Sequence, residues 1–285
     1  MQSLRLRRKG FGIETSSEKM DRPFIQRIRI YPIKSLDPVE VQQAEVGIHS
    51  LKYDRSFALL GEDGRFINGK RTGLVNQLKA SYDLENQFVF LSRRGEETVH
   101  KFELKPENSE LVGYLEDFFG IKLVLLQNSN GKLMDIPTQS SVTVISTATL
   151  QSLQNDLKDH TLEDLRLRFR ANIEIEGVEA FWEEKLFQVP GVGVRFTVGE
   201  VEMIGVSPRA RCNVPPRNPM NGETDKSFIK KMMRSRLSSL PKDSTLLHYG
   251  NTYQLTVNTY LSPDQKGKIM KVGDPVEIKE TVTFK

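Results

Sequence analysis

Val194-Arg-Phe-Thr-Val198, Gly199 and Val201-Glu-Met-Ile204 lead directly into Val206-Ser-Pro-Arg-Ala-Arg-Cys-Asn-Val-Pro-Pro-Arg-Asn-Pro-Met-Asn-Gly-Glu223. The two β-branched segments on either side of Gly199 predict a β-hairpin. The run that follows is rich in proline, which fixes φ and cannot donate a backbone hydrogen bond. The sequence therefore predicts a stiff loop over 206–223, which is neither a helix nor a central strand.

This loop contains the one cysteine of the chain, Cys212, with Arg209, Arg211 and Arg217 within five residues of it. Nearby positive charge favours the thiolate, which is the form that attacks electrophiles and binds soft metals. A lone cysteine is more often a small buried apolar residue. The arginine and asparagine neighbours on a rigid loop favour a functional thiol over that alternative.

Composition limits the classes of protein to consider. A chain of 285 residues with 38% hydrophobic residues forms one large domain or two of ordinary size. One cysteine excludes an internal disulfide and any zinc or iron–sulfur site built from several thiolates of this chain. No apolar run has the ~18–20 residues that a membrane span needs. These features indicate a cytoplasmic protein without a membrane span.

The net charge of +4 is concentrated at the beginning of the chain. Residues 1–22 contain six basic and three acidic side chains, or +3, which leaves +1 for the remainder. The basic character is therefore a property of the first segment, and no nucleic-acid partner is expected. Because this segment lacks the apolar core of a secretory signal, we interpret residues 1–22 either as a disordered leader or as sequence that precedes a true start at Met20.

Short β-branched and aromatic segments separated by turn residues recur along the chain. They predict a mainly β protein of the α+β class, with two β-barrel-like domains over 23–126 and 133–280, and a polar linker at 127–132. Helical spacing of apolar residues predicts a few peripheral helices, at 109–119, 149–159 and 227–237, and one that begins at Thr161. Strands are expected at 24–31, 39–46, 55–60, 65–67, 88–91, 99–104, 121–126, 172–176, 194–198, 201–204, 253–257 and 276–278.

Four parts of the sequence together resemble the MOSC domain family. The first is the hairpin and the Arg-x-Cys loop ending in Asn218-Pro-Met-Asn-Gly-Glu223, and the second is Arg168-Phe-Arg-Ala-Asn-Ile173. The third is Gly267-Lys-Ile-Met-Lys-Val-Gly-Asp-Pro-Val276. Finally, Tyr31-Pro-Ile-Lys-Ser35 and Tyr53-Asp-Arg-Ser-Phe57 resemble the β-barrel domain that precedes MOSC in the amidoxime-reducing molybdenum enzymes. The match extends from about Phe24 to Ile278.

The resemblance implies a molybdenum cofactor and a set of residues that bind it. Cys212 would be the catalytic residue and the metal ligand, because its thiolate would join the pterin dithiolene on molybdenum, a centre that suits soft sulfur ligands. Positions matching the family's cofactor contacts are predicted to bind the pterin and its phosphate, for which Lys, Arg and hydroxyl donors are suited. They are Lys34, Ser35, Arg55, Arg170 and Asn172, together with Arg211.

By the same resemblance, the chain would be an oxidoreductase that reduces small N-hydroxylated or otherwise N-oxygenated compounds. One cysteine cannot bind an iron–sulfur cluster, so electrons would come from a separate donor protein of the ferredoxin or flavoprotein type. An alternative is a non-catalytic cofactor-binding protein or a sulfur or cofactor carrier. The barrel motif with Lys34 and Ser35 favours the reductase type, and a sulfurase would need a large additional pyridoxal-phosphate domain.

Two positions depart from the pattern of the amidoxime-reducing enzymes. Those enzymes have Ser where this chain has Ala210, and family members often have Asp where it has Asn218. A hydroxyl and a charge near the metal are therefore absent, which leaves open a relative that binds the pterin without turnover. Taken singly, Lys34 and Ser35 also fit an ordinary exposed turn, and Arg170 fits a solvated charge.

Overall fold

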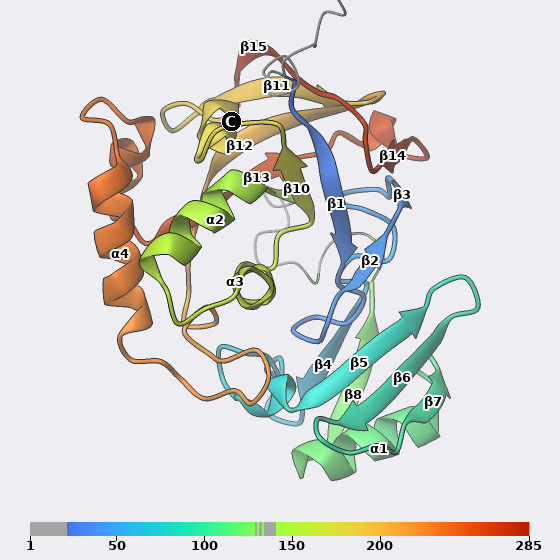
Figure 1. Cartoon of the computed structure of the whole chain (residues 1–285). Helices are drawn as coiled ribbons and strands as arrows, with labels where there is room; N and C mark the ends of the chain where they lie inside the picture. Colours follow the sequence, from blue (N-terminus) through green and yellow to red (C-terminus); the bar gives the residue numbers. More distant parts are fainter. Residues whose placement is uncertain (1–21, 129, 131–132, 134–140, 285) are drawn as a thin grey trace, which may run out of the picture.

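The computed structural model describes residues 22–128, 130, 133 and 141–284. The predicted leader 1–22 lies outside the described residues except for Arg22, and so do residues 129, 131 and 132 of the predicted linker. Figure 1 shows a large sheet with three helices beside it at one end of the molecule, and a smaller sheet with one helix at the other end. No helix in the described part of the chain has the length and apolar character needed to cross a membrane.

The large sheet has eight strands, and it takes strands from both ends of the chain. Neighbouring strands are antiparallel except for the parallel pair β9 and β10. The order across the sheet is β15 (Val276–Thr283), β11 (Val192–Val198), β12 (Val201–Ala210), β13 (Gln254–Tyr260), β9 (Thr143–Ser146), β10 (Ile173–Glu176), β1 (Phe24–Ile30) and β2 (Val39–Val41). The outermost strands β15 and β2 do not pair with each other, so this sheet is not closed into a barrel. The predicted mainly β, α+β class is confirmed.

Three smaller sheets complete the β-structure of the described residues. They pair β14 (Ile269–Lys271) with β3 (Gln43–Glu45), β4 (Phe57–Gly61) with β8 (Leu123–Gln127), and β5 (Leu78–Asp83) with β6 (Phe88–Arg93) and β7 (His100–Glu103). The helices are α1 (Ser109–Phe119), α2 (Thr147–Asp156), α3 (Leu162–Phe169) and α4 (Phe228–Ser239). Short 3₁₀ helices cover Leu74–Asn76, Trp182–Leu186, Thr245–Tyr249 and Pro263–Gln265.

The apolar residues form three hydrophobic cores. The core of the smaller end contains residues between Ile33 and Leu125, mainly from β4 to β8 and α1. A second core combines residues of 25–51 with residues of 142–276, because β1 and β2 belong to the large sheet. A third core joins α2, α3 and α4 to β9 and β13. Burial of each Leu, Ile or Phe contributes ~1.5–3 kcal/mol, so the first strand of the chain is firmly attached to its second half.

Several sequence-based predictions differ from the structure, among them the strand expected at 65–67, of which only a bridge between Leu60 and Phe66 forms. The expected strand 39–46 divides at Gln42 into β2, which pairs with β1, and β3, which pairs with β14. The predicted loop over 206–223 was wrong for its first five residues, because β12 continues to Ala210. Beyond Gly205, β12 pairs only with β13, so Pro208 lies where β11 no longer needs a backbone donor. The predicted hairpin before it is confirmed as β11 and β12.

Candidate functional site

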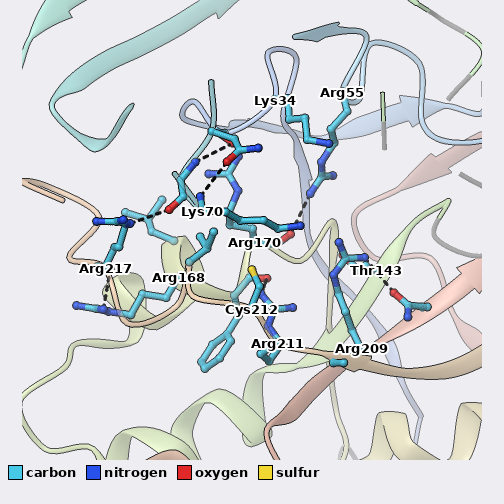
Figure 2. Close-up of a pocket in the computed structure, with 18 of the residues that line it drawn as sticks. Lys34, Arg55, Lys70, Thr143, Arg168, Arg170, Arg209, Arg211, Cys212 and Arg217 are labelled. Atoms are coloured by element: carbon cyan, nitrogen blue, oxygen red, sulfur yellow. Dashed lines mark hydrogen bonds between the residues drawn. The ribbon is translucent and has the colours of Figure 1, made fainter. Parts of the chain in front are cut away.

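A cavity of about 510 Å³ lies between segments from the two halves of the chain. All seven predicted site residues line it, namely Lys34, Ser35, Arg55, Arg170, Asn172, Arg211 and Cys212. Figure 2 shows the sulfur of Cys212 near the centre of the view, with arginine and lysine side chains around it. The structure thus brings together residues that the sequence separates by up to 178 positions, while their individual roles stay predictions.

The lining of the cavity is strongly cationic. Among the described residues that line it, eight are basic and none is acidic. The basic residues are Lys34, Arg55, Lys70, Arg168, Arg170, Arg209, Arg211 and Arg217. A concave surface lined by one sign of charge concentrates ligands of the opposite sign. The cavity is therefore suited to an anionic ligand.

Cys212 follows the last residue of β12 by two positions and is held there by its backbone. The backbone N–H of Arg211 donates to the carbonyl of Tyr253 at 3.0 Å. In return, the hydroxyl of Tyr253 donates to the carbonyl of Cys212 at 3.2 Å. The thiol itself is partly exposed and is not in a disulfide. These bonds fix the main chain at the cysteine and leave the sulfur available to the cavity.

Arg168 holds the proline-rich part of the same loop. Its side chain is buried, and Nη1 donates to the carbonyl oxygens of Pro215 at 2.7 Å and Arg217 at 2.8 Å. Nε donates to Oδ2 of Asp164 at 2.6 Å, and that oxygen is also 2.7 Å from Nδ1 of His160. The carboxylate orients the guanidinium, which in turn fixes the loop after Cys212. In the sequence, this arginine is recognisable only as part of the motif Arg168-Phe-Arg-Ala-Asn-Ile173.

Ser35 and its neighbour Lys34 lie on a turn of unusual backbone conformation. Ser35 has a φ of 74°, in the left-handed region that non-glycine residues seldom adopt. The backbone N–H of Lys34 donates to the carbonyl of Phe57 at 2.8 Å, which anchors the turn to β4. Nζ of Lys34 donates to the carbonyl of Leu133 at 2.8 Å, and the N–H of Gly69 donates to Oγ of Ser35 at 3.4 Å.

Arg55 and Asn172 form a buried hydrogen-bonded group. Nη1 of Arg55 donates to both carboxylate oxygens of Asp54, at 2.8 and 2.6 Å, and to Oδ1 of Asn172 at 3.0 Å. The same Oδ1 accepts from the backbone and the hydroxyl of Thr143, both at 3.2 Å. Nδ2 of Asn172 donates to the carbonyl of Arg29 and to Asp54, both at 3.0 Å. Asn172 is 1% exposed, and its amide is fully used within the protein.

Arg170 ends α3 with a φ of 55°, so that its side chain leaves the helix toward the cavity. Its guanidinium lies 4.2 Å from the centre of the Tyr31 ring, and that of Arg55 lies 4.4 Å from the same ring. Nη2 of Arg170 donates to the carbonyl of Leu36 at 2.7 Å. Burial lowers the pKa of Arg170, and the nearby charge of Arg55 lowers it further. An anion in the cavity would offset both effects.

Two glycine-containing loops close one side of the cavity. Nε of Arg217 donates to the carbonyl of Gly69 at 2.7 Å, and Nη1 donates to the carbonyl of Gly222 at 3.1 Å. The loops approach so closely that a Cβ on Gly222 would lie 2.2 Å from the carbonyl oxygen of Gly73. Only glycine fits at such a contact. The loop around Lys70 therefore meets the loop that follows Cys212.

The loop around Lys70 was not among the site segments predicted from the sequence. Asn68, Gly69 and Lys70 line the cavity, as do Thr143, Gln254 and Asn258. The signal available for the loop was Asn68-Gly-Lys-Arg-Thr-Gly73, a basic turn between two glycines. The residues of β9 and β13 carried no such signal, because they occur in ordinary strand patterns.

Comparison with known proteins agrees with the four motifs. The model of the MOSC N-terminal beta barrel domain matches residues 22–115, and that of the MOSC domain matches residues 124–277. Two curated relatives carry the name molybdenum cofactor sulfurase. The one from Homo sapiens is 24% identical over 79% of this chain and 30% of its own length, and the one from Bos taurus is 23% identical over 84% and 31%.

This chain spans about a third of the length of the curated relatives that it matches. Among solved structures, the YUAD protein from Bacillus subtilis aligns with 92% of this chain and 97% of its own, at 10% identity and a TM-score of 0.39.

Proposed function

The chain belongs to the MOSC domain family, and from that premise we propose that its cationic cavity binds a molybdenum cofactor. The name of the sulfurase relatives supports this cofactor class. The observation that carries the proposal is the cavity itself, where a partly exposed thiol lies among eight basic side chains and no acidic one in the described lining.

The residues present fit such a group. Molybdopterin carries a phosphate, for which arginine and lysine are the usual partners. Arg170 is a partly buried cation with a lowered pKa, and its guanidinium donates to the carbonyl of Leu36 and to no carboxylate among the described residues, so a phosphate would complete its surroundings. Cys212 supplies a soft sulfur ligand beside these cations. When bound, the cofactor would supply the redox couple and the Lewis acidity of the metal.

We assign the protein residues three roles. Lys34, Ser35, Arg55 and Arg170 bind the pterin and its phosphate from one side, and Arg211 binds from the cysteine loop. Cys212 binds the metal through its thiolate. Asn172 acts through Arg55, because its amide already donates to Arg29 and Asp54 and accepts from Thr143. This positioning role refines the contact that the family resemblance implies for Asn172.

The activity that we propose is reduction of small N-hydroxylated or N-oxygenated compounds. The substrate takes up two electrons and two protons, its N–O bond breaks, and the oxygen leaves as water. A separate one-electron carrier of the ferredoxin or flavoprotein type would supply the electrons, since these residues contain a single cysteine. Cys212 holds the metal, while the cationic cavity orients cofactor and substrate.

A second candidate is cofactor binding without reduction, as in a sulfur or cofactor carrier. Two observations favour it. The curated relatives are named sulfurases, and Ala210 stands where the amidoxime-reducing enzymes have a hydroxyl. The resemblance of Tyr31-Pro-Ile-Lys-Ser35 and Tyr53-Asp-Arg-Ser-Phe57 to the amidoxime-reducing enzymes favours the reductase, and we therefore place the carrier second.

The first test is the molybdenum and pterin content of protein expressed with cofactor synthesis intact. We expect near-stoichiometric metal in the wild type and a marked loss in Cys212→Ala. The control is Arg234→Met, which removes an exposed cation of α4 outside the cavity and should leave the content unchanged. Absence of metal and pterin from the wild type, under conditions that load a known relative, would overturn the proposal.

The second test separates the two candidates. Molybdenum-loaded protein is mixed with reduced methyl viologen and benzamidoxime, and formation of benzamidine is followed. Turnover that disappears in Cys212→Ala supports the reductase. Full loading without turnover favours the carrier.

A further inference from the structure

One wall of the cavity has a polar group that the cofactor assignment does not use. Arg209 is the penultimate residue of β12, and its Nη1 donates to Oδ1 of Asn258 on β13 at 3.0 Å. Nδ2 of Asn258 donates to Oγ of Ser207 at 3.2 Å, which fixes the orientation of the amide. In Figure 2, Arg209 and Arg217 lie on opposite sides of Cys212. Arg209 thus reaches the cavity from the wall opposite the loop contact of Arg217.

Gln254 adds an acceptor to the same wall. It lines the cavity, is 3% exposed, and its Nε2 donates to the carbonyl of Tyr249 at 2.7 Å. That bond to a carbonyl identifies the amide nitrogen and therefore the oxygen. Oε1 is buried and has no hydrogen-bond partner among the described residues. A buried acceptor without a partner costs ~1–3 kcal/mol, so Oε1 is poised to accept from a ligand donor.

The backbone around this wall is irregular. The pairing of β12 with β13 shifts at Arg209, because Pro208 faces Val257 whereas Ala210 faces Gln254. Opposite it, Thr256 has a φ of 67°, a left-handed conformation that is strained for a β-branched residue. Such bulges change the direction of side chains, and they are common beside active sites.

We propose that Arg209, Gln254 and Asn258 form the substrate subsite of the cavity, and that this subsite selects N-oxygenated compounds that carry a carboxylate group. The inference rests on the proposed reductase function. A guanidinium binds a carboxylate through paired hydrogen bonds. The amino group on the amidoxime carbon, which also carries the reducible nitrogen, donates to Oε1 of Gln254. The reaction converts the C=N–OH group into C=N–H and water, with two electrons from the external reductant and two protons.

The test compares benzamidoxime with 4-carboxybenzamidoxime, on molybdenum-loaded protein with reduced methyl viologen as the electron source. We expect the wild type to prefer the carboxylate compound ~10-fold or more in kcat/KM, the range of one charge-assisted hydrogen bond. Arg209→Gln should remove that preference by raising KM for the carboxylate compound, so that the ratio of kcat/KM for the two compounds, measured on the same preparation, falls to ~1. Gln254→Leu should instead lower kcat/KM for both compounds, because both have the amidoxime N–H.

Arg234→Gln is the matched control, because it removes the same charge from an exposed position on α4. It should retain the wild-type preference. A measurement independent of turnover is isothermal titration of the product, 4-carboxybenzamidine, into oxidised loaded protein, where Arg209→Gln should weaken Kd ~10-fold.

The outcomes distinguish the subsite from the function on which it rests. Turnover of benzamidoxime without preference for the carboxylate compound, or a preference that persists in Arg209→Gln, overturns the subsite and leaves the reductase intact. Loaded protein that reduces neither compound overturns both.

Discussion

Nη1 of Arg55 lies 3.0 Å from Oδ1 of Asn172, although 117 positions separate the two residues in the sequence. The bond joins the turn before β4 to the segment between α3 and β10. Asn172 also binds Asp54, which binds Arg55 in turn, so each of the three side chains contacts the other two. A small displacement of one therefore moves the others, and the arginine that we assign to the cofactor depends on a buried amide.

Replacement of Asn172 by Asp should reduce stability and cofactor content together. The carboxylate keeps the acceptor for Arg55 but loses both donors, and it brings a second negative charge within hydrogen-bond distance of Oδ1 of Asp54. Loss of buried donors and like-charge repulsion should lower the free energy of unfolding by ~2–4 kcal/mol. Chemical denaturation measures this change. Asn155→Asp, on the exposed face of α2, should stay within ~0.5 kcal/mol of wild type.

Replacement of Arg170 by Met should separate ligand binding from stability. Burial lowers the pKa of this guanidinium, which means that the cofactor-free fold carries a cation in a poorly solvating position. An apolar side chain of similar length removes that cost, so we expect the cofactor-free protein to unfold within ~1 kcal/mol of wild type or to be more stable. The pterin content should nevertheless fall several-fold.

The contrast for Arg170 is Arg166, one turn earlier on α3. Arg166 donates to both oxygens of the buried Glu174 at 2.7 Å, so Arg166→Met removes the main partner of that carboxylate and leaves it the hydroxyl of Thr147 at 2.9 Å and Nε of Arg27 at 4.0 Å. That change should cost ~3–5 kcal/mol in stability. Equal losses of stability in Arg170→Met and Arg166→Met would contradict the assignment of Arg170 to ligand binding and of Arg166 to stability.

Gly73 tests the contact between the two loops beside Cys212. A Cβ at this position would lie 2.7 Å from the carbonyl oxygen of Gly222, which is backbone that cannot rotate away, and 3.2 Å from Nη1 of Arg217. Gly73→Ala should therefore separate the loops, weaken the bonds that Arg217 makes to both of them, and lower molybdenum retention during dialysis. Gly113→Ala is the control, since nothing lies within 4 Å of a Cβ there. Inside α1 that change should stabilise by ~0.5–1 kcal/mol.

The sequence predicted which motif residues line the cavity, but it did not predict how distant segments come together to form its walls. The spacing of apolar residues predicted α1 at 109–119 with both ends correct, because Asn108 caps the helix and Gly120 ends it in the left-handed region. The seven site residues follow from motifs whose order along the chain is distinctive. Their convergence on one cavity does not follow from the motifs, because it depends on the pairing of β1 with β10 across nearly 150 residues.

Two residues of the proposed substrate subsite, Gln254 and Asn258, had no recognisable signature in the local sequence. Gln254 and Asn258 occur in an ordinary strand pattern, and the pairing of β13 with β12 places both in the wall of the cavity, where Asn258 accepts from Arg209. Proline at 208 suggested a loop because a central strand normally needs every donor. The strand continues because its other neighbour, β11, ends its pairing with β12 at Gly205. Such features arise from tertiary pairing and not from local propensity.

The last prediction concerns Glu183, which is 2% exposed in the short helix Trp182–Leu186 and accepts from the hydroxyl of Thr149 at 3.0 Å. Burial raises the pKa of this carboxyl to about 7, and the hydrogen bonds only partly oppose the shift. A folded-state pKa above the unfolded value means that the folded protein holds the proton more tightly. The stability from this group is therefore greatest below about pH 4.5, and it falls as the pH rises toward about 7.

Across that interval the loss should amount to ~3 kcal/mol, at ~1.4 kcal/mol for each unit of pKa shift. Glu183→Gln keeps the shape and removes the titration. The free energy of unfolding of Glu183→Gln minus that of the wild type should therefore increase by ~2–3 kcal/mol from pH 5 to pH 8, because only the wild type loses stability. Urea denaturation at the two pH values measures this. Glu97→Gln, an exposed carboxyl, should show the same difference from wild type at both. A parallel response in the two variants would mean that Glu183 ionises at its ordinary pKa in the fold.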